Sequence, residues 1–159
     1  MSKGRRTRKD DVGKLRARAR RRALQAIYQW QMAGQDLQDI EKQFTEEMDM
    51  SEIDLEFFRE FLFGVPKQVD ELDERFRGFL DRTPEQLDPI ERAILRMGTF
   101  ELATRPDVPV RVVINEAVEL AKQFGAEQSH KYITGVLDRV ARGLPLRVAE
   151  IQAGRDKAE

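Results

Sequence analysis

Arginine side chains crowd a short stretch near the amino-terminal end of the sequence, between residues 16 and 22, in a segment with helical spacing. Gln25 and Tyr28 follow just beyond them. The planar guanidinium of arginine pairs bidentately with phosphate and stacks on bases. Aromatic stacking and hydrogen bonds to base edges are typical of single-stranded RNA recognition. The stretch therefore favours a nucleic-acid partner, and RNA before DNA, because no helix-turn-helix or basic-zipper pattern follows it.

The distribution of charge supports the same interpretation. The chain of 159 residues has a formal net charge of −1, yet residues 1–22 hold eleven Lys and Arg against two Asp, and the other 137 residues hold 17 basic against 27 acidic side chains. Such asymmetry indicates a polyanionic partner for the basic segment. An inert, solvated basic end is the alternative, and it is less favoured because the charge continues into a segment with a clear apolar face.

Residues suited to catalysis are scarce. His130 is the single histidine, and the absence of cysteine excludes disulfides, thiolate metal sites and cysteine nucleophiles. The sequence contains no Gly-x-Ser-x-Gly elbow, P-loop or Gly-x-Gly-x-x-Gly loop. Glu127 and His130 have the i, i+3 spacing of helical di-iron sites, but such a site needs a second motif with a second histidine. We therefore expect no enzyme activity, no cofactor and no metal site, and we expect His130 to be a solvated residue of a first helical turn.

The segment from Lys14 to Gly34 has an apolar arc and a polar arc at about 100° per residue, which predicts an amphipathic helix that ends at Gly34. Arg16 and Arg20 do not fit this division, because they lie nearer the apolar side. Either the first turns of the helix overhang the core, or these two arginines pair with carboxylates. The apolar arc consists of Leu15, Ala19, Ala23, Ala26, Ile27 and Trp30.

Helical spacing continues through most of the remaining sequence, and no segment alternates with a period of two. The prediction is an all-α fold of about seven helices with short connectors. Residues 90–103 are apolar nearly all round, which is typical of a buried central helix. Capping residues and prolines mark the expected helix starts, at Ser51–Asp54, Pro66, Thr83–Gln86, Asp88–Glu91 and Pro109.

Breaks in composition and pattern predict the domain organisation. We expect a flexible basic arm over residues 1–13, a single helical domain over residues 14–143 and a tail over residues 144–159. Within the domain, an N-terminal bundle is expected at about 14–80 and a C-terminal bundle at about 83–143, with hinges near Gly64–Pro66 and Asp81–Pro89.

No apolar run approaches the ~18–20 residues that span a bilayer, and no apolar segment follows the basic start as in a secretory signal. We therefore expect a soluble, cytoplasmic protein; a homodimer is left open.

Two further groups of charged residues have alternative interpretations. Residues 36–60 carry ten Asp and Glu against Lys42 and Arg59. This acidic face serves either solubility or the docking of a basic protein. On the expected central helix, Arg96 and Glu101 are interpreted as a satisfied pair at the core or its rim.

Four blocks of the sequence occur in the order found in one known family: Ala19–Trp30, Leu87–Arg96 with Phe100–Leu102, Asp107–Lys122 and Gln123–Asp138. They resemble the NusB family of bacterial transcription antitermination factors. The resemblance covers roughly residues 14–142, and it implies an all-α fold of two small packed bundles with three to four helices each. It also implies a non-catalytic role in RNA polymerase antitermination complexes. In those complexes the family binds boxA, a single-stranded leader element of ribosomal RNA operons, as a heterodimer with the small-subunit ribosomal protein NusE.

The resemblance implies roles for individual side chains at the starts of the first and last helices. Family members meet the RNA with the arginine-rich start of the first helix and with the start of the last helix. The residues of this sequence implied in RNA binding are Arg16, Arg18, Arg20, Arg21, Arg22, Gln25, Arg96, Gln128 and Tyr132. Those implied in NusE docking are Tyr28, Glu85 and Glu91.

Two departures from the family pattern stand out. Thr134 occupies a position before Gly-Val-Leu where the family usually has asparagine, and a hydroxyl replaces only part of the hydrogen bonding of an amide. The basic residues at 1–12 exceed what the family needs.

Two other function classes are alternatives: a helical adaptor with an inert basic tail, and a helical part of an RNA cytosine methyltransferase. The second needs a Rossmann-like domain with a glycine-rich loop, which these 159 residues do not encode.

Overall fold

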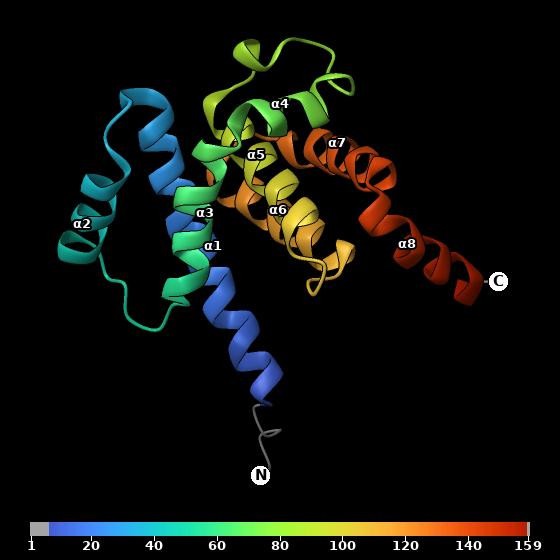
Figure 1. Cartoon of the computed structure of the whole chain (residues 1–159), viewed down its shortest axis with the longest axis horizontal. Helices are drawn as coiled ribbons and strands as arrows, with labels where there is room; N and C mark the ends of the chain where they lie inside the picture. The colour runs from blue at the N-terminus through green and yellow to red at the C-terminus, as the bar shows by residue number, and fades with distance from the viewer. Residues whose placement is uncertain (1–6, 159) are drawn as a thin grey trace. The chain divides into compact units, whose positions relative to one another are not determined.

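The computed structural model of the chain describes residues 7–158, apart from the side chains of Lys9 and of residues beyond Gly154 (Figure 1). Residues 1–6 of the expected basic arm, with Lys3, Arg5 and Arg6, lie outside the described residues. Every regular element in the described part is a helix, which confirms the predicted all-α class. Eight α-helices occur there, where about seven were predicted, and a short 3₁₀ helix, Pro84–Gln86, precedes the fifth. They are α1 (Arg8–Ala33), α2 (Leu37–Glu47), α3 (Leu55–Lys67), α4 (Val69–Arg77), α5 (Pro89–Thr104), α6 (Val110–Phe124), α7 (Ser129–Gly143) and α8 (Pro145–Ala158).

The packing divides the chain into two compact units, with the boundary inside α3 between Gly64 and Val65. The first unit contains α1, α2 and most of α3. The second unit contains α4 to α8. The α4 helix, which the sequence pattern places in the N-terminal bundle, packs on α5 in the second unit.

Small side chains on α1 and aromatic side chains on α3 form the core of the first unit. Alanines at 19, 23 and 26 are fully buried, so other helices can approach the α1 backbone closely. Phe44 of α2 stacks against Phe58 of α3 with ring centroids 6.0 Å apart. Phe57 and Phe61 meet edge to face at 4.9 Å. This apolar packing holds one side of α1 and leaves its other side for polar residues.

The two ends of α1 have recognisable caps. At the start, Thr7 and Asp10 form a capping box, in which the Asp10 N–H donates to Thr7 Oγ1 at 3.1 Å and the Thr7 N–H donates to the Asp10 carboxylate at 3.2 Å. The helix therefore begins at Arg8, earlier than the Lys14 start that the apolar pattern predicts. At the other end, Gly34 has a φ of 65° and its N–H donates to the Trp30 carbonyl at 2.9 Å, which confirms the predicted helix end.

The α5 helix is the centre of the second unit, as its nearly continuous apolar sequence predicts. Its residues from Ala93 to Leu102 are buried apart from Arg96, and it packs on α4, α6 and α7. Gly98 lets α7 approach closely, because a Cβ at this position would lie 2.8 Å from Leu137 Cδ1. The predicted caps before α5 are confirmed. Thr83 and Gln86 form a capping box, and the Asp88 carboxylate accepts from the Ile90 N–H at 2.9 Å.

Two sequence-based helix assignments differ from the structure. Pro66 was expected to open a helix, but it lies in the last turn of α3. The next helix begins only at Val69, where the Gln68 carbonyl accepts its first hydrogen bond, from the Leu72 N–H at 2.9 Å. The expected tail beyond residue 144 is α8, which packs on α7. No helix in the described part of the chain is long and apolar enough to cross a membrane.

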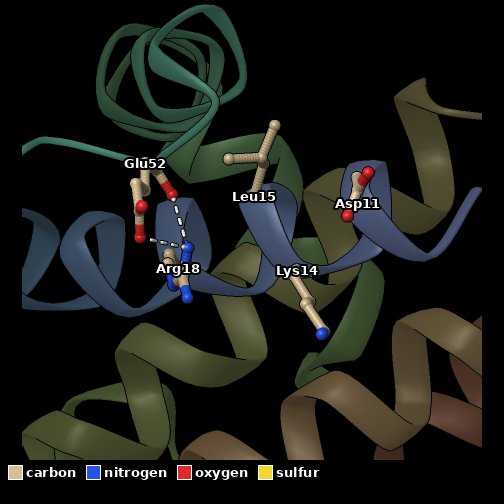
Figure 2. A pocket seen from close by; sticks show the side chains of 5 residues that line it. All are labelled: Asp11, Lys14, Leu15, Arg18 and Glu52. Atoms are coloured by element: carbon tan, nitrogen blue, oxygen red, sulfur yellow. Dashed lines mark hydrogen bonds and ion pairs between the residues drawn. The ribbon is translucent and has the colours of Figure 1, made fainter. Parts of the chain in front are cut away.

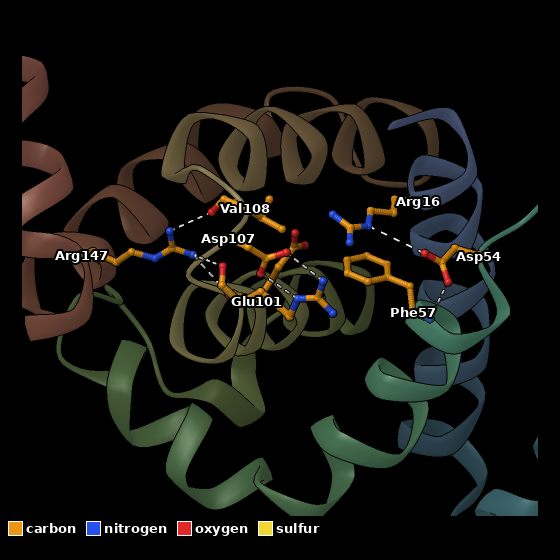
Figure 3. Close-up of polar contacts among 8 residues, drawn as sticks. Arg16, Asp54, Phe57, Glu101, Asp107, Val108 and Arg147 are labelled. Carbon is orange, nitrogen blue, oxygen red and sulfur yellow. Dashed lines mark hydrogen bonds and ion pairs between the residues drawn. The ribbon is translucent and has the colours of Figure 1, made fainter. Parts of the chain in front are cut away.

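A fully buried arginine fastens α8 to the end of α5. The Arg147 side chain has no exposed surface, and its Nε donates to the Leu102 carbonyl at 2.9 Å. Its Nη1 donates to the Val108 carbonyl at 2.8 Å (Figure 3). Its Nη2 donates to the Arg105 carbonyl, also at 2.8 Å. Glu150 Oε2 balances the charge at 2.9 Å from Nη1. Arg147 therefore satisfies carbonyls that the end of α5 and the following loop would otherwise leave unpaired.

Candidate nucleic-acid interface

The arginines on the polar side of α1 contact a short acidic loop of the same unit. Arg18 Nη1 donates to both the carbonyl and the carboxylate of Glu52, at 3.1 and 3.2 Å (Figure 2). Arg22 Nε donates to the Asp49 carbonyl at 3.3 Å. Lys14 lies in the same region, where it lines a hollow of about 330 Å³ together with Asp11, Leu15, Arg18 and Glu52.

The acidic loop is charged at neutral pH. Hydrogen bonds from Ser51, with smaller contributions from the charges of Arg22 and Arg18, lower the pKa of the exposed Asp49 carboxyl below its ordinary value of 3.8. Glu52 adopts a φ of 55°, which brings its carbonyl and its carboxylate to the same guanidinium. Part of the acidic face at residues 36–60 therefore neutralises arginines of α1 inside the unit.

Arg16 and Arg20 have a different environment, on the side of α1 that packs against α3. Both guanidinium carbons lie over the Phe57 ring, 5.1 and 5.0 Å from its centroid. Arg16 Nε also lies 3.8 Å from the Asp54 carboxylate, so the prediction of a carboxylate partner is confirmed for this residue (Figure 3). Only 4% of the surface of Arg20 is exposed to solvent. The structure gives these two arginines a packing role beneath the polar side of α1.

Gln25, Tyr28 and Arg21 complete the predicted set on α1. Arg21 is half-buried and makes no hydrogen bond or ion pair with the described residues. Gln25 Oε1 accepts from Arg22 Nη1 at 2.9 Å, which links the arginines to an amide. Tyr28 is 36% exposed. A groove of about 370 Å³ extends from Gln25 and Tyr28 along the surface of α1 and α2, lined further by Gln29, Met32, Ala33, Gln43, Phe44 and Met48.

In the second unit, Tyr132 on α7 contacts a segment far away in sequence. Its hydroxyl donates to Asp81 Oδ1 at 3.0 Å and accepts from the Asp81 N–H at 3.4 Å. Arg82 donates to the same carboxylate, from Nε at 2.7 Å and from Nη2 at 3.2 Å, and its guanidinium carbon lies 5.2 Å from the centroid of the Tyr132 ring. Hydrogen bonds from Arg82 and then from Tyr132 lower the pKa of Asp81 below 3.8. Burial raises the pKa of Tyr132 above 10.0.

Gln128 lies at the start of α7, and Glu91 lies in the first turn of α5. Gln128 precedes α7 with a φ of 73°, and its side chain is exposed. Burial, and then the charge of Asp88, raises the pKa of Glu91 above its ordinary value of 4.5, although the charge of Arg82 and a hydrogen bond with Ser129 oppose the shift. Glu85, by contrast, is exposed, and a hydrogen bond from its own backbone N–H lowers its pKa.

Arg96 is held in an ion pair with α4. Its Nε and Nη2 donate to the two carboxylate oxygens of Asp73 at 2.9 and 2.8 Å, and both side chains are mostly buried. The expected partner was Glu101, whereas the structure shows Asp73 in this position. Thr134, the departure from the family pattern, donates to the His130 carbonyl within α7 at 2.7 Å. His130 itself is half-buried.

Sequence analysis missed the acidic residues that contact Arg18, Arg22 and Tyr132. Asp49 and Glu52 lie 27 and 34 residues from the arginines that they contact, and Asp81 lies 51 residues from Tyr132. A carboxylate has no periodic signal of its own in a sequence with 29 Asp and Glu. The one local indication of such a contact was the adjacent acid and base at Asp81 and Arg82, at the start of the predicted hinge Asp81–Pro89.

These features define an all-helical protein whose first helix carries a basic side suited to a polyanion. The model of the NusB family matches residues 17–142. The chain therefore belongs to the NusB family, and its curated relatives are named transcription antitermination protein NusB.

Curated relatives and a solved NusB structure agree with this assignment. The relative from Alkalilimnicola ehrlichii is 51% identical over 162 aligned residues, covering 91% of this chain and 90% of that protein. The relative from Alcanivorax borkumensis is 53% identical over 141 residues, covering 89% and 94%. The solved structure of T. maritima NusB is 30% identical with a TM-score of 0.71, covering 81% of this chain and 92% of that one. A chain in the crystal structure of a plectonemic RNA supercoil shares the fold, with a TM-score of 0.72 at 24% identity.

Proposed function

We propose that this chain acts in transcription antitermination by binding boxA RNA of ribosomal RNA operon leaders together with NusE, without catalysis. The observation that carries the proposal is the row of arginines on the polar side of α1, joined to an amide by the hydrogen bond between Arg22 and Gln25. Family membership supports it, since the curated relatives are antitermination proteins. RNA polymerase antitermination complexes in the cytoplasm are the proposed setting.

Phosphate anchoring is the proposed role of the α1 arginines. Arg18, Arg21 and Arg22 lie on the polar side of the helix, where their guanidinium groups can exchange a carbonyl or carboxylate partner for a phosphate. Arg16 and Arg20 stay within the proposed set. Their stacking on Phe57 fixes the turn of α1 from which the other arginines project.

Base recognition is the proposed role of Gln25, Gln128 and Tyr132. The two amides offer a donor and an acceptor to base edges, and the Tyr132 ring offers a face for stacking. Arg96 belongs to the proposed RNA set through its place on α5 as a positioning residue, because its mostly buried ion pair with Asp73 is kept when RNA binds.

NusE docking is proposed at Tyr28, Glu85 and Glu91. Tyr28 borders the groove on α1 and α2, and the two glutamates lie near the start of α5. The exposed carboxylate of Glu85 and the half-buried one of Glu91 suit a basic ribosomal protein, because opposite charges steer association and reject wrong partners. A homodimer, in which apolar helix stripes pack between two copies of the chain, is the alternative to this heterodimer.

Titration of labelled boxA RNA over a salt series tests the proposal. The logarithm of the association constant falls with the logarithm of salt by ~0.7 for each phosphate contact to a single strand. Reversing three charges with Arg18→Glu, Arg21→Glu and Arg22→Glu is expected to weaken binding by ~100-fold or more and to reduce this slope by ~2.

The matched control reverses three exposed cations outside the proposed set, with Arg75→Glu, Arg111→Glu and Arg139→Glu. It changes the net charge equally and is expected to weaken binding far less. An inert basic tail on a helical adaptor predicts instead that both triple variants behave alike, with fold and partner retained. Circular dichroism confirms that the helices are intact in each variant.

A further inference from the structure

A cation that the sequence analysis did not single out lies against one of the proposed base-recognition side chains. The Arg82 guanidinium lies over the Tyr132 ring and donates two hydrogen bonds to the Asp81 carboxylate. The Tyr132 hydroxyl donates to Oδ1 of the same carboxylate. Each of the three side chains therefore contacts the other two. We call this cluster of Asp81, Arg82 and Tyr132 the Asp81 clasp.

The ion pair in the Asp81 clasp is open to solvent. The Arg82 side chain is 41% exposed and that of Asp81 is 65% exposed. Water and salt screen such a pair strongly, so its replacement by another anion costs little. The Tyr132 ring holds the guanidinium by its π face, an attraction that does not depend on the carboxylate.

The Asp81 carboxylate occupies the position that a phosphate would take. Two parallel N–H donors of one guanidinium meet two oxygens, which is the geometry that arginine uses for carboxylate and phosphate alike. A backbone phosphate beside Tyr132 could use the same donors while its neighbouring base stacks near the ring. Left in place, the Asp81 charge repels an approaching RNA strand.

We propose that Arg82 is a phosphate-binding residue of the RNA interface and that Asp81 is its internal competitor, displaced when a single-stranded RNA phosphate takes over the guanidinium. This inference rests on the proposed RNA-binding function, and it adds a residue and an exchange step to it. The exchange costs little, because the ion pair is exposed, and Asp81 opposes binding only through its competing charge.

Fluorescence anisotropy of labelled boxA RNA, over a salt series, tests the two residues separately. Arg82→Gln is expected to weaken binding by ~5-fold or more and to lower the salt slope by ~0.7, which is one phosphate contact. Arg82→Lys keeps the charge but loses the planar donors, so an intermediate affinity is expected. Asp81→Asn is expected to tighten binding by ~3-fold, because one competing charge is removed.

A double variant separates competition from simple charge repulsion. If Asp81 acts by occupying Arg82, Asp81→Asn has no effect when Arg82→Gln is also present. An equal gain from Asp81→Asn with and without Arg82 would overturn the proposal. So would unchanged affinity and salt slope in Arg82→Gln.

The Glu74–Arg77 ion pair on α4 is the matched control. Its Nε–Oε1 distance is 2.8 Å, and its side chains are 70% and 45% exposed, close to the values in the Asp81 clasp. Glu74→Gln and Arg77→Gln are expected to change the dissociation constant by less than ~2-fold. Equal weakening by Arg77→Gln and Arg82→Gln would show a general charge effect and overturn the assignment of Arg82.

The same titrations distinguish failure of the inference from failure of the proposed function. A wild-type chain that binds boxA RNA no better than a scrambled strand overturns both. A wild-type chain that prefers boxA, combined with an Arg82→Gln variant of unchanged affinity, overturns only the role of Arg82.

Discussion

Cations in this molecule are held by partners whose burial differs from site to site, and that difference decides what each cation can do. Arg18 and Arg82 have exposed carboxylate partners and can exchange them for a ligand. Arg96 shares a mostly buried pair with Asp73, and Arg147 has no exposed surface at all. Removing one partner of a buried pair leaves the other without compensation, whereas an exposed partner turns to water.

Arg147 gives the clearest prediction for stability. Arg147→Met keeps most of the side-chain volume but leaves the carbonyls of Leu102, Arg105 and Val108 without their donor. We expect the free energy of unfolding in urea to fall by about 3 kcal/mol or more. Val148→Ala, on an exposed position of α8, is the control and is expected to change it by less than ~0.5 kcal/mol. A loss below ~1 kcal/mol for Arg147→Met would contradict the role given to this residue.

Glu91 gives a prediction for the pH dependence of NusE binding. Burial raises its pKa above 4.5, so its charge is lost at a higher pH than that of an ordinary glutamate. As the pH falls into the mildly acidic range, we expect the affinity for NusE to decline as Glu91 takes up a proton, at a higher pH than an ordinary glutamate would. Because folding raises this pKa, protonation favours the folded chain, and Glu91 itself does not promote acid unfolding.

Two glutamine variants identify the group responsible for that pH dependence. Glu91→Gln is expected to lower the NusE affinity at pH 7 and to flatten its decline in mild acid. Glu85→Gln is the control, because the pKa of Glu85 is lowered and this carboxylate stays charged throughout. Calorimetric titration at several pH values measures both, and a decline that persists unchanged in Glu91→Gln would exclude this residue as the cause.

The helices are positioned by their ends and by one close approach. Caps at Thr83, Asp88 and Gly34 were predictable, since the residues that satisfy a helix end lie within a few positions of it. The start of α1 was not predicted, because the Thr7–Asp10 box lies among basic residues without an apolar pattern. The α8 helix was not predicted, for a related reason. Its buried anchor is the side chain of Arg147, and an arginine does not contribute to an apolar pattern in the sequence.

Replacing Gly98 on α5 and Gly135 on α7 by alanine is expected to change the stability of the protein in opposite directions. A Cβ at Gly98 would lie 2.8 and 3.0 Å from the two Cδ atoms of Leu137, in the core. We expect Gly98→Ala to lower the melting temperature, with a cost of about 1–3 kcal/mol from overpacking. A Cβ added at Gly135 on α7 would meet no other atom within 4 Å, so Gly135→Ala is expected to stabilise the protein by up to ~1 kcal/mol. Stabilisation by Gly98→Ala would show that Leu137 moves aside easily.

For the molecule as a whole, the all-α class and the basic side of α1 were readable from the sequence, because both depend on the spacing of neighbouring residues. The acidic partners of Arg18, Arg96 and Tyr132 were not, since Glu52, Asp73 and Asp81 reach these side chains through folding. The boundary inside α3 was obscured in the same way, because Pro66 continues a helix that the sequence suggests it should open.

The central claim is that this chain binds boxA RNA specifically, with NusE. The most direct measurement compares the dissociation constants of boxA RNA and of a scrambled strand of equal length and composition, with NusE present, at one salt concentration. We expect boxA to bind at least ~10-fold more tightly than the scrambled strand, a difference of about 1.4 kcal/mol, and to bind more tightly with NusE than without it. Equal dissociation constants for the two strands, in the presence of NusE, would contradict the account.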